Sequence, residues 1–91
     1  RVKKKDIVTK ISLNTGISSK LVKAVVDNFL EEITCALEKG ERVELRRFGV
    51  FKVTYRKGRE MLHPRLRKKV IIPERRHPFF KPGKILKKRV Q

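Results

Sequence analysis

The sequence predicts an α+β fold with a two-helix base, a three-stranded antiparallel sheet carrying an extended β-hairpin arm, and a short C-terminal helix. Apolar residues recur with helical spacing over residues 3–39, and they alternate with polar residues over 41–53. The basic stretch 55–73, with Pro64 in its middle, lies between strand-like segments, which indicates a two-stranded arm with the proline near its tip.

The first helix is expected over residues 3–15. Ile7, Val8 and Ile11 form one apolar stripe, and Gly16 suits the position just after a helix end. Lys4 lies at the helix start, where the helix dipole disfavours a cation. A phosphate contact and a solvated basic end are therefore equally good interpretations of this lysine.

The second helix is expected to start at Ser18 or Ser19, either of which can cap it, and to end near Lys39 before Gly40. Its apolar residues cover about half of the circumference, which is more than a surface helix needs. They are Leu21, Val22, Val25, Val26, Phe29, Leu30, Ile33, Ala36 and Leu37. Since domains of this size bury only about 60% of their unfolded surface, a second subunit sharing this face is physically favoured.

A β-hairpin is expected next. Residues 41–45 alternate, and the alternation resumes over 51–53 after a tight turn at 46–49. This turn is expected to expose backbone N–H groups beside Arg46 and Arg47. Those groups suit a phosphate seat, although an ordinary hairpin turn with solvated charges is an equally good interpretation.

The arm is expected to continue from this second strand and to return through residues 70–72, which Pro73 ends. Pro64 cannot donate a ladder hydrogen bond, so it belongs at the tip. After the arm, the aromatic segment 78–80 is expected in the core or at a dimer seam. The last helix is expected over 84–90, with its apolar Ile85, Leu86 and Val90 facing inward.

The charge distribution indicates a polyanionic partner. Lys and Arg number 26 against 9 Asp and Glu, which gives a net charge of +17 and a pI near 10.9. Residues 1–41 carry only +2 of this charge and residues 42–91 carry +15. The first part is therefore interpreted as scaffold and the second as a binding surface, with nucleic acid preferred over anionic membranes or heparin-like chains.

Enzymatic and metal-binding functions are not expected. The sequence has no glycine-rich phosphate loop and no catalytic constellation, and His63 and His77 lack a third ligand at suitable spacing. The single Cys35 excludes an internal disulfide, favours a reducing compartment, and is interpreted as a small, partly buried residue. We therefore predict no cofactor and no small-molecule substrate.

No membrane association is predicted either, because no apolar run reaches spanning length and no secretory leader is recognisable. The sequence begins at Arg1 rather than Met, so we expect it to start inside a longer gene product.

The arm suits nucleic acid in particular. A basic two-stranded ribbon can follow the minor groove while its cations neutralise phosphates, and a proline at the tip can enter a base step and kink the duplex. A disordered basic loop would grip DNA without such geometry. The apolar returning segment 70–72 argues against that alternative.

Over essentially its whole length, the chain resembles the bacterial histone-like HU and integration host factor proteins. The Phe-Gly-x-Phe turn and the Phe-x-Pro-Gly-Lys entry to the last helix are fairly specific in combination. The matching motifs are Gly40-Glu41-Arg42-Val43-Glu44-Leu45, Arg47-Phe48-Gly49-Val50-Phe51, Arg56-Lys57-Gly58-Arg59, Pro64, Ile72-Pro73 and Phe80-Lys81-Pro82-Gly83-Lys84.

This resemblance implies an intertwined dimer whose two arms wrap the minor groove, with Pro64 as the intercalating wedge. The domain would be a single unit of residues 1–91, with a dimerisation body at about 1–54 and 74–91 and a DNA-wrapping arm at about 55–73. The candidate DNA contacts are Lys4, Arg46, Arg47, Gly49, Arg56, Lys57, Arg59, His63, Pro64, Arg65, Arg67, Lys68, Lys69, Arg75, Lys84 and Lys87.

The tip departs from the family pattern. Where the family has Gly-Arg-Asn-Pro, this chain has Met61-Leu62-His63-Pro64, and Arg67 replaces the turn glycine that follows. A tip turn of different shape is therefore expected. The four basic residues in the five positions after Pro64 are expected to replace the missing groove arginine. The alternative is weaker intercalation with more purely electrostatic binding.

The sequence thus predicts an architectural protein that binds duplex DNA with low sequence selectivity and bends or compacts it. We expect a homodimer, with a heterodimer as the alternative, in the nucleoid of the bacterial cytoplasm. Two other functions stay open: a sequence-selective bending factor of the same fold, and a protein that binds structured RNA.

Overall fold

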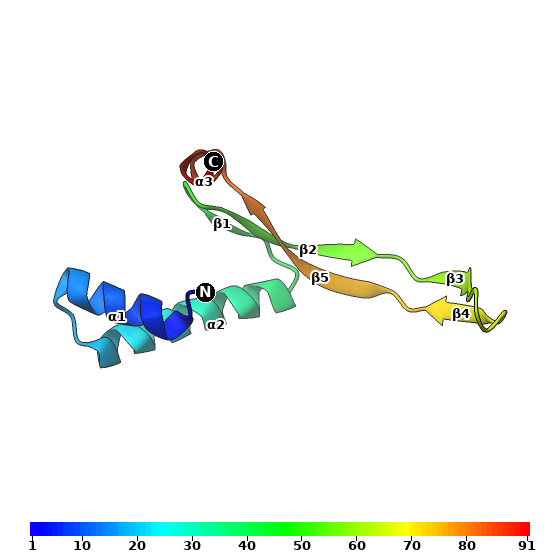
Figure 1. Cartoon of the computed structure of the whole chain (residues 1–91), viewed down its shortest axis with the longest axis horizontal. Helices are drawn as coiled ribbons and strands as arrows, with labels where there is room; N and C mark the ends of the chain where they lie inside the picture. The colour runs from blue at the N-terminus through cyan, green and yellow to red at the C-terminus, as the bar shows by residue number, and fades with distance from the viewer. The chain divides into compact units, whose positions relative to one another are not determined.

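The computed structural model describes residues 1–91, which divide into two compact units, 1–35 and 36–91. No helix combines the length and apolar character needed to cross a membrane. The elements follow one another as α1 (Lys4–Thr15), α2 (Ser19–Glu38), β1 (Val43–Leu45), β2 (Gly49–Arg56), β3 (Arg59–Leu62), β4 (Lys69–Ile72), β5 (Arg75–Pro82) and α3 (Lys84–Val90) (Figure 1). The predicted order of helices and strands is confirmed.

The helix ends follow their sequence signals. The backbone N–H of Lys3 donates to the Asp6 carboxylate at 3.0 Å and caps the start of α1. Gly16 ends this helix with a φ of 76°, a left-handed conformation that glycine adopts without strain. The Ser18 hydroxyl accepts the N–H of Leu21 at 3.3 Å, which identifies Ser18 as the cap of α2.

The helical part has a very small core of its own. Val8 and Val22 are the only buried apolar side chains, with 6% and 5% of their surface exposed. Much of the broad apolar stripe of α2 faces outward, because Leu21 is 61%, Val25 69% and Phe29 50% exposed. A single chain therefore leaves most of this stripe without a covering layer.

The strands form two antiparallel sheets. The first has the order β1-β2-β5, with Val43 opposite Phe51 and with β2 paired to β5 as far as Arg56 opposite Arg75. The second consists of β3 and β4 and forms the outer end of the ribbon in Figure 1. The predicted strand over 41–45 begins two residues later than expected, whereas the returning strand ends before Pro73 as predicted.

An aromatic cluster packs on the three-stranded sheet. The Phe80 ring lies 5.3 Å from that of Phe48 and 4.7 Å from that of Phe51, measured between centroids. Gly49 lets the chain pass this cluster, because a Cβ there would lie 2.6 Å from the Phe80 ring and from the Lys81 carbonyl. Phe80 is half-buried in this cluster, whereas Pro78 and Phe79 are exposed, so within this chain only Phe80 of the segment 78–80 has the core packing that was one of the two expectations.

The expectation for the apolar face of α3 is wrong for the single chain. Leu86 is half-buried, but Ile85 and Val90 are 47% and 78% exposed. The seven-residue helix directly follows β5, and no layer of this chain covers those two side chains. Like the stripe of α2, they form apolar surface without a partner.

Arg76 on β5 caps the end of α2. Its Nη2 donates to the carbonyl oxygens of Leu37 and Glu38 at 3.3 and 3.0 Å, and its guanidinium lies 5.8 Å from the centre of the Tyr55 ring. The last carbonyls of a helix lack intrahelical donors and attract cations. We therefore expect Arg76→Ala to lower the free energy of unfolding by about 1 kcal/mol in urea titrations. Arg75→Ala, which removes a neighbour without such bonds, should leave the midpoint unchanged; equal losses would contradict the capping role.

Candidate nucleic-acid interface

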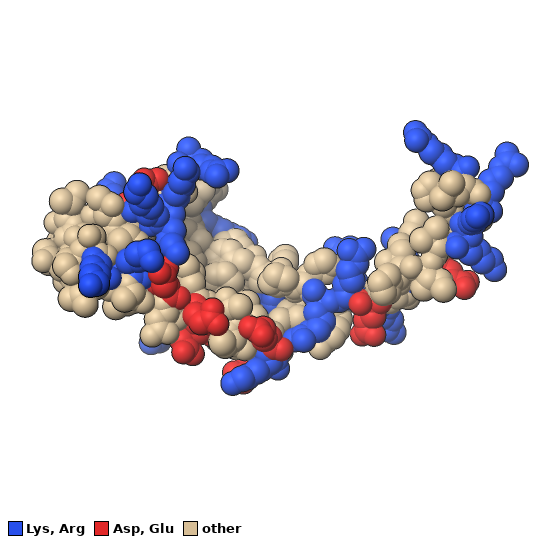
Figure 2. All heavy atoms as spheres, turned by 90° about the horizontal axis from the view of Figure 1, so that it is seen from below, with Lys and Arg blue, Asp and Glu red and all other residues tan.

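The arm, residues 55–73, is an exposed basic ribbon. All side chains of residues 55–73 are exposed except His63 and Ile72, which are half-buried. Lysine and arginine side chains project around its end in Figure 2. The basic residues of the ribbon and its base are Arg56, Lys57, Arg59, Arg65, Arg67, Lys68, Lys69 and Arg75, and the acidic ones are Glu60 and Glu74. Exposed cations of this density on an extended ribbon are suited to a polyanion.

Pro64 lies in the turn between β3 and β4, as predicted. Backbone hydrogen bonds of 2.9 Å close this turn from His63 N–H to the Lys68 carbonyl and from Arg67 N–H to the His63 carbonyl. Leu62 and Leu66 on either side of the proline are 65% and 62% exposed. The tip therefore presents apolar surface surrounded by cations, which is the composition of a side-chain wedge for base steps.

Arg67 has a φ of 50°, in the left-handed region. Glycine adopts this conformation freely, and a residue with a Cβ does so at a cost of about 1–2 kcal/mol. Arg67 thus adopts a backbone conformation that favours glycine, and the different shape expected for the tip turn stays a prediction.

A basic hollow marks the base of the arm. It lies where the pairing of β2 with β5 ends and that of β3 with β4 begins, and it has a volume of about 410 Å³. Its lining residues are Arg56, Lys57, Arg59, Ile72, Pro73, Arg75 and His77. The structure thus brings together four predicted contacts. His77 also lines this hollow. The sequence did not indicate His77 as a DNA contact, because its position beside the arm depends on the register of β5.

The turn after β1 gathers a second basic group. A hollow of about 290 Å³ there is lined by Arg46, Arg47, Gly49 and Lys84, among others, so residues distant in sequence meet at one place. Arg47 has a left-handed φ of 70°. The expected exposure of backbone N–H groups is wrong for Phe48, whose N–H donates to the Leu45 carbonyl at 2.9 Å. The site therefore depends on its cationic side chains more than predicted.

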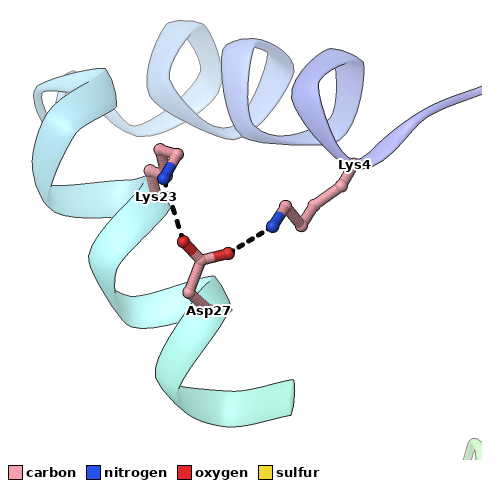
Figure 3. A network of polar contacts seen from close by, with 3 residues as sticks. All are labelled: Lys4, Lys23 and Asp27. Atoms are coloured by element: carbon pink, nitrogen blue, oxygen red, sulfur yellow. Dashed lines mark hydrogen bonds and ion pairs between the residues drawn. The ribbon is translucent and has the colours of Figure 1, made fainter. Parts of the chain in front are cut away.

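Lys4 lies in an ion-pair network on the helices. Its Nζ is 2.6 Å from one carboxylate oxygen of Asp27, and the Nζ of Lys23 is 3.1 Å from the other (Figure 3). These hydrogen bonds, first from Lys4 and then from Lys23, lower the pKa of Asp27. Stabilisation of the folded state by this carboxylate is therefore present above its ordinary pKa and is lost as the pH falls through the lowered value.

The remaining candidate Lys87 is exposed in the last turn of α3. No group of three or more metal-ligating side chains is present, and the Cys35 thiol lies 3.5 Å from a carboxylate oxygen of Glu31. Together, the basic ribbon, its proline tip and the basic turn define a class of small α+β proteins that present a β-arm to a polyanion.

Comparisons with known proteins place the chain within this class. A family model described as bacterial DNA-binding protein matches residues 2–91. DNA-binding protein HU of Thermotoga maritima is 43% identical over 88 residues, which cover 97% of this chain and 98% of that protein. Integration host factor subunit beta of Buchnera aphidicola is 43% identical over 76 residues, which cover 84% of this chain and 78% of that protein.

A solved structure shows the same fold. The Anabaena HU–DNA cocrystal structure superimposes with a TM-score of 0.87 at 32% identity and covers 98% of this chain and 97% of that chain. The chain belongs to the bacterial DNA-binding protein family that includes HU and integration host factor. The resemblance found in the sequence is confirmed.

Proposed function

We propose that this protein is an architectural DNA-binding protein that bends or compacts duplex DNA with low sequence selectivity. The observation that carries the proposal is the exposed basic ribbon with Pro64 in its tip turn. A relative of the same fold is an HU protein crystallised with DNA. The protein would act in the nucleoid of the bacterial cytoplasm. It would hold and bend DNA through its shape and charge and would catalyse no reaction.

The arm would follow the minor groove while its cations neutralise phosphates, and Pro64 would enter a base step and kink the duplex. The basic hollow at the arm's base and the cluster around Arg47 would hold the backbone on either side of the kink. The proposed contacts are Arg56, Lys57, Arg59 and Arg75 at the base, His63, Arg65, Arg67, Lys68 and Lys69 at the tip, Arg46, Arg47, Gly49 and Lys84 at the turn, and Lys4 and Lys87 on flanking DNA.

The active form would be an intertwined dimer. Leu21, Val25 and Phe29 present a continuous apolar face of α2, and exposed apolar surface of this kind is unfavourable in water. A second copy supplies the same face and would cover it symmetrically. We propose a homodimer, in which each copy contributes one arm; a heterodimer with a related chain would use the same surface.

Salt-dependent binding tests this function. Affinity for duplex DNA should fall with salt by about one log-log slope unit for each phosphate neutralised. Affinity for an A-form RNA duplex should be weaker, because its grooves do not fit a β-arm. Equal or tighter binding to the RNA would overturn the proposal in favour of the structured-RNA alternative.

A sequence-selective bending factor is the second candidate. It is favoured by the relatives named integration host factor subunit beta, which are as similar over their matched residues as the HU relatives. Competition with random duplex at physiological salt separates the two. Binding to a selected site that survives a large excess of competitor would establish selectivity, whereas a general binder is displaced.

Asp27→Asn is expected to raise DNA affinity. The substitution releases Lys4 and Lys23 from their shared carboxylate and makes them available to phosphates. The measured salt dependence should become steeper by about one unit for each added phosphate contact. Glu31→Gln is the matched control, since it makes the same charge change on the same helix but contacts no lysine. Equal gains from both variants would show that only net charge matters.

A further inference from the structure

His63 closes the turn at the tip of the arm. Its N–H donates to the Lys68 carbonyl and its carbonyl accepts the Arg67 N–H, both at 2.9 Å. Its Nδ1 accepts two further backbone N–H groups, those of Arg65 and Leu66, both at 3.2 Å. The side chain is half-buried in a turn whose other residues are exposed. His63 is thus hydrogen-bonded to Arg65, Leu66, Arg67 and Lys68, so this one residue holds together the turn that carries Pro64.

We propose that His63 is the positioning residue of the wedge: its imidazole Nδ1 fixes the turn that presents Pro64 to a base step. This inference rests on the proposed DNA-bending function. Pro64 has no N–H of its own, and the N–H groups of Arg65 and Leu66 have no other acceptor in the chain. Without the imidazole acceptor, the two residues after the proline lose their only protein hydrogen bonds.

The chemistry of the acceptor explains why a histidine can serve here. Nδ1 is bonded to Cγ, as is the side-chain oxygen of asparagine, and an asparagine oxygen stabilises turns by accepting N–H groups further along the chain. The Nδ1 of a histidine can therefore take the place of an asparagine oxygen as the acceptor that holds this turn.

Energy transfer between the ends of a short duplex at saturating protein tests the inference. The wild type should bend DNA, and His63→Asn, which keeps an acceptor bonded to Cγ, should bend it to the same extent. His63→Ala should bend DNA less, because the population of the turn falls about five- to thirtyfold without the acceptor.

The same variants distinguish this inference from the proposed function. The temperature dependence of the Arg65 and Leu66 amide proton shifts in the DNA-free protein reports the turn alone. It should show hydrogen-bonded amides in the wild type and in His63→Asn, and solvent-bonded amides in His63→Ala. Full bending by His63→Ala, or a His63→Asn variant that bends DNA no more than His63→Ala does, would overturn the role of His63. A wild type with hydrogen-bonded amides that binds DNA without bending it would instead overturn the proposed function.

Discussion

Replacing Pro64 by alanine is expected to remove most of the DNA bend while leaving most of the affinity. An inserted side-chain wedge kinks a duplex by roughly 20–90°, and alanine is too small to unstack a base step. The cations of the ribbon and of the turn after β1 are untouched, so the phosphate contacts that dominate affinity should survive. We expect affinity to change by less than about tenfold, whereas the bend measured by energy transfer between duplex ends should fall by tens of degrees.

Pro73→Ala is the matched control for this prediction. Pro73 is also an exposed proline of the arm, but it follows β4 at the base of the ribbon rather than lying in the tip turn. Its replacement should leave the bend unchanged. A wild-type bend in Pro64→Ala would count against intercalation and would indicate bending by phosphate neutralisation alone.

Phe29→Ala is expected to destabilise the protein far more than its exposure in a single chain suggests. With 50% of its surface exposed, this side chain would contribute little to the stability of a monomer. Substitutions at such exposed positions usually change the free energy of unfolding by about 0.5 kcal/mol or less. If a second copy covers the face, each copy loses a buried phenylalanine at a cost of about 3–5 kcal/mol. Sedimentation equilibrium should show dissociation, and the melting temperature should become strongly dependent on protein concentration.

Thr34→Ala provides the comparison on the same helix. Its side chain is exposed, and its hydroxyl only donates to the Leu30 carbonyl within the helix. The substitution should leave the dimer intact. A wild-type protein that sediments as a stable monomer, or a Phe29→Ala variant as stable as the wild type, would contradict the proposed dimer.

The sequence located the three helices and the strands up to β4 because their signals are local, whereas β5 was not located. Apolar spacing and the Ser18 and Gly16 ends locate the helices, and alternation locates β1 and β2. Pro64 was placed at the tip because a proline cannot donate within a ladder. The family followed from motifs in a fixed order along the chain.

The side-chain contacts of the site could not be predicted in the same way. Asp27 meets Lys4 across 23 residues and Arg76 meets Glu38 across 38, so both contacts depend on how elements pack. The imidazole cap at His63 depends on a turn conformation that periodicity does not describe. The inward face predicted for α3 was wrong because amphipathic spacing shows that an apolar face exists, and not which chain covers it.

Energy transfer between fluorophores on the two ends of a short DNA duplex tests the central claim most directly. The unmodified protein is titrated into the duplex at physiological salt while binding is followed in parallel. The proposed wrapping by two arms predicts that transfer rises as the protein binds and reaches a plateau at a fixed number of protein chains per duplex. Saturated binding with no rise in transfer would contradict it.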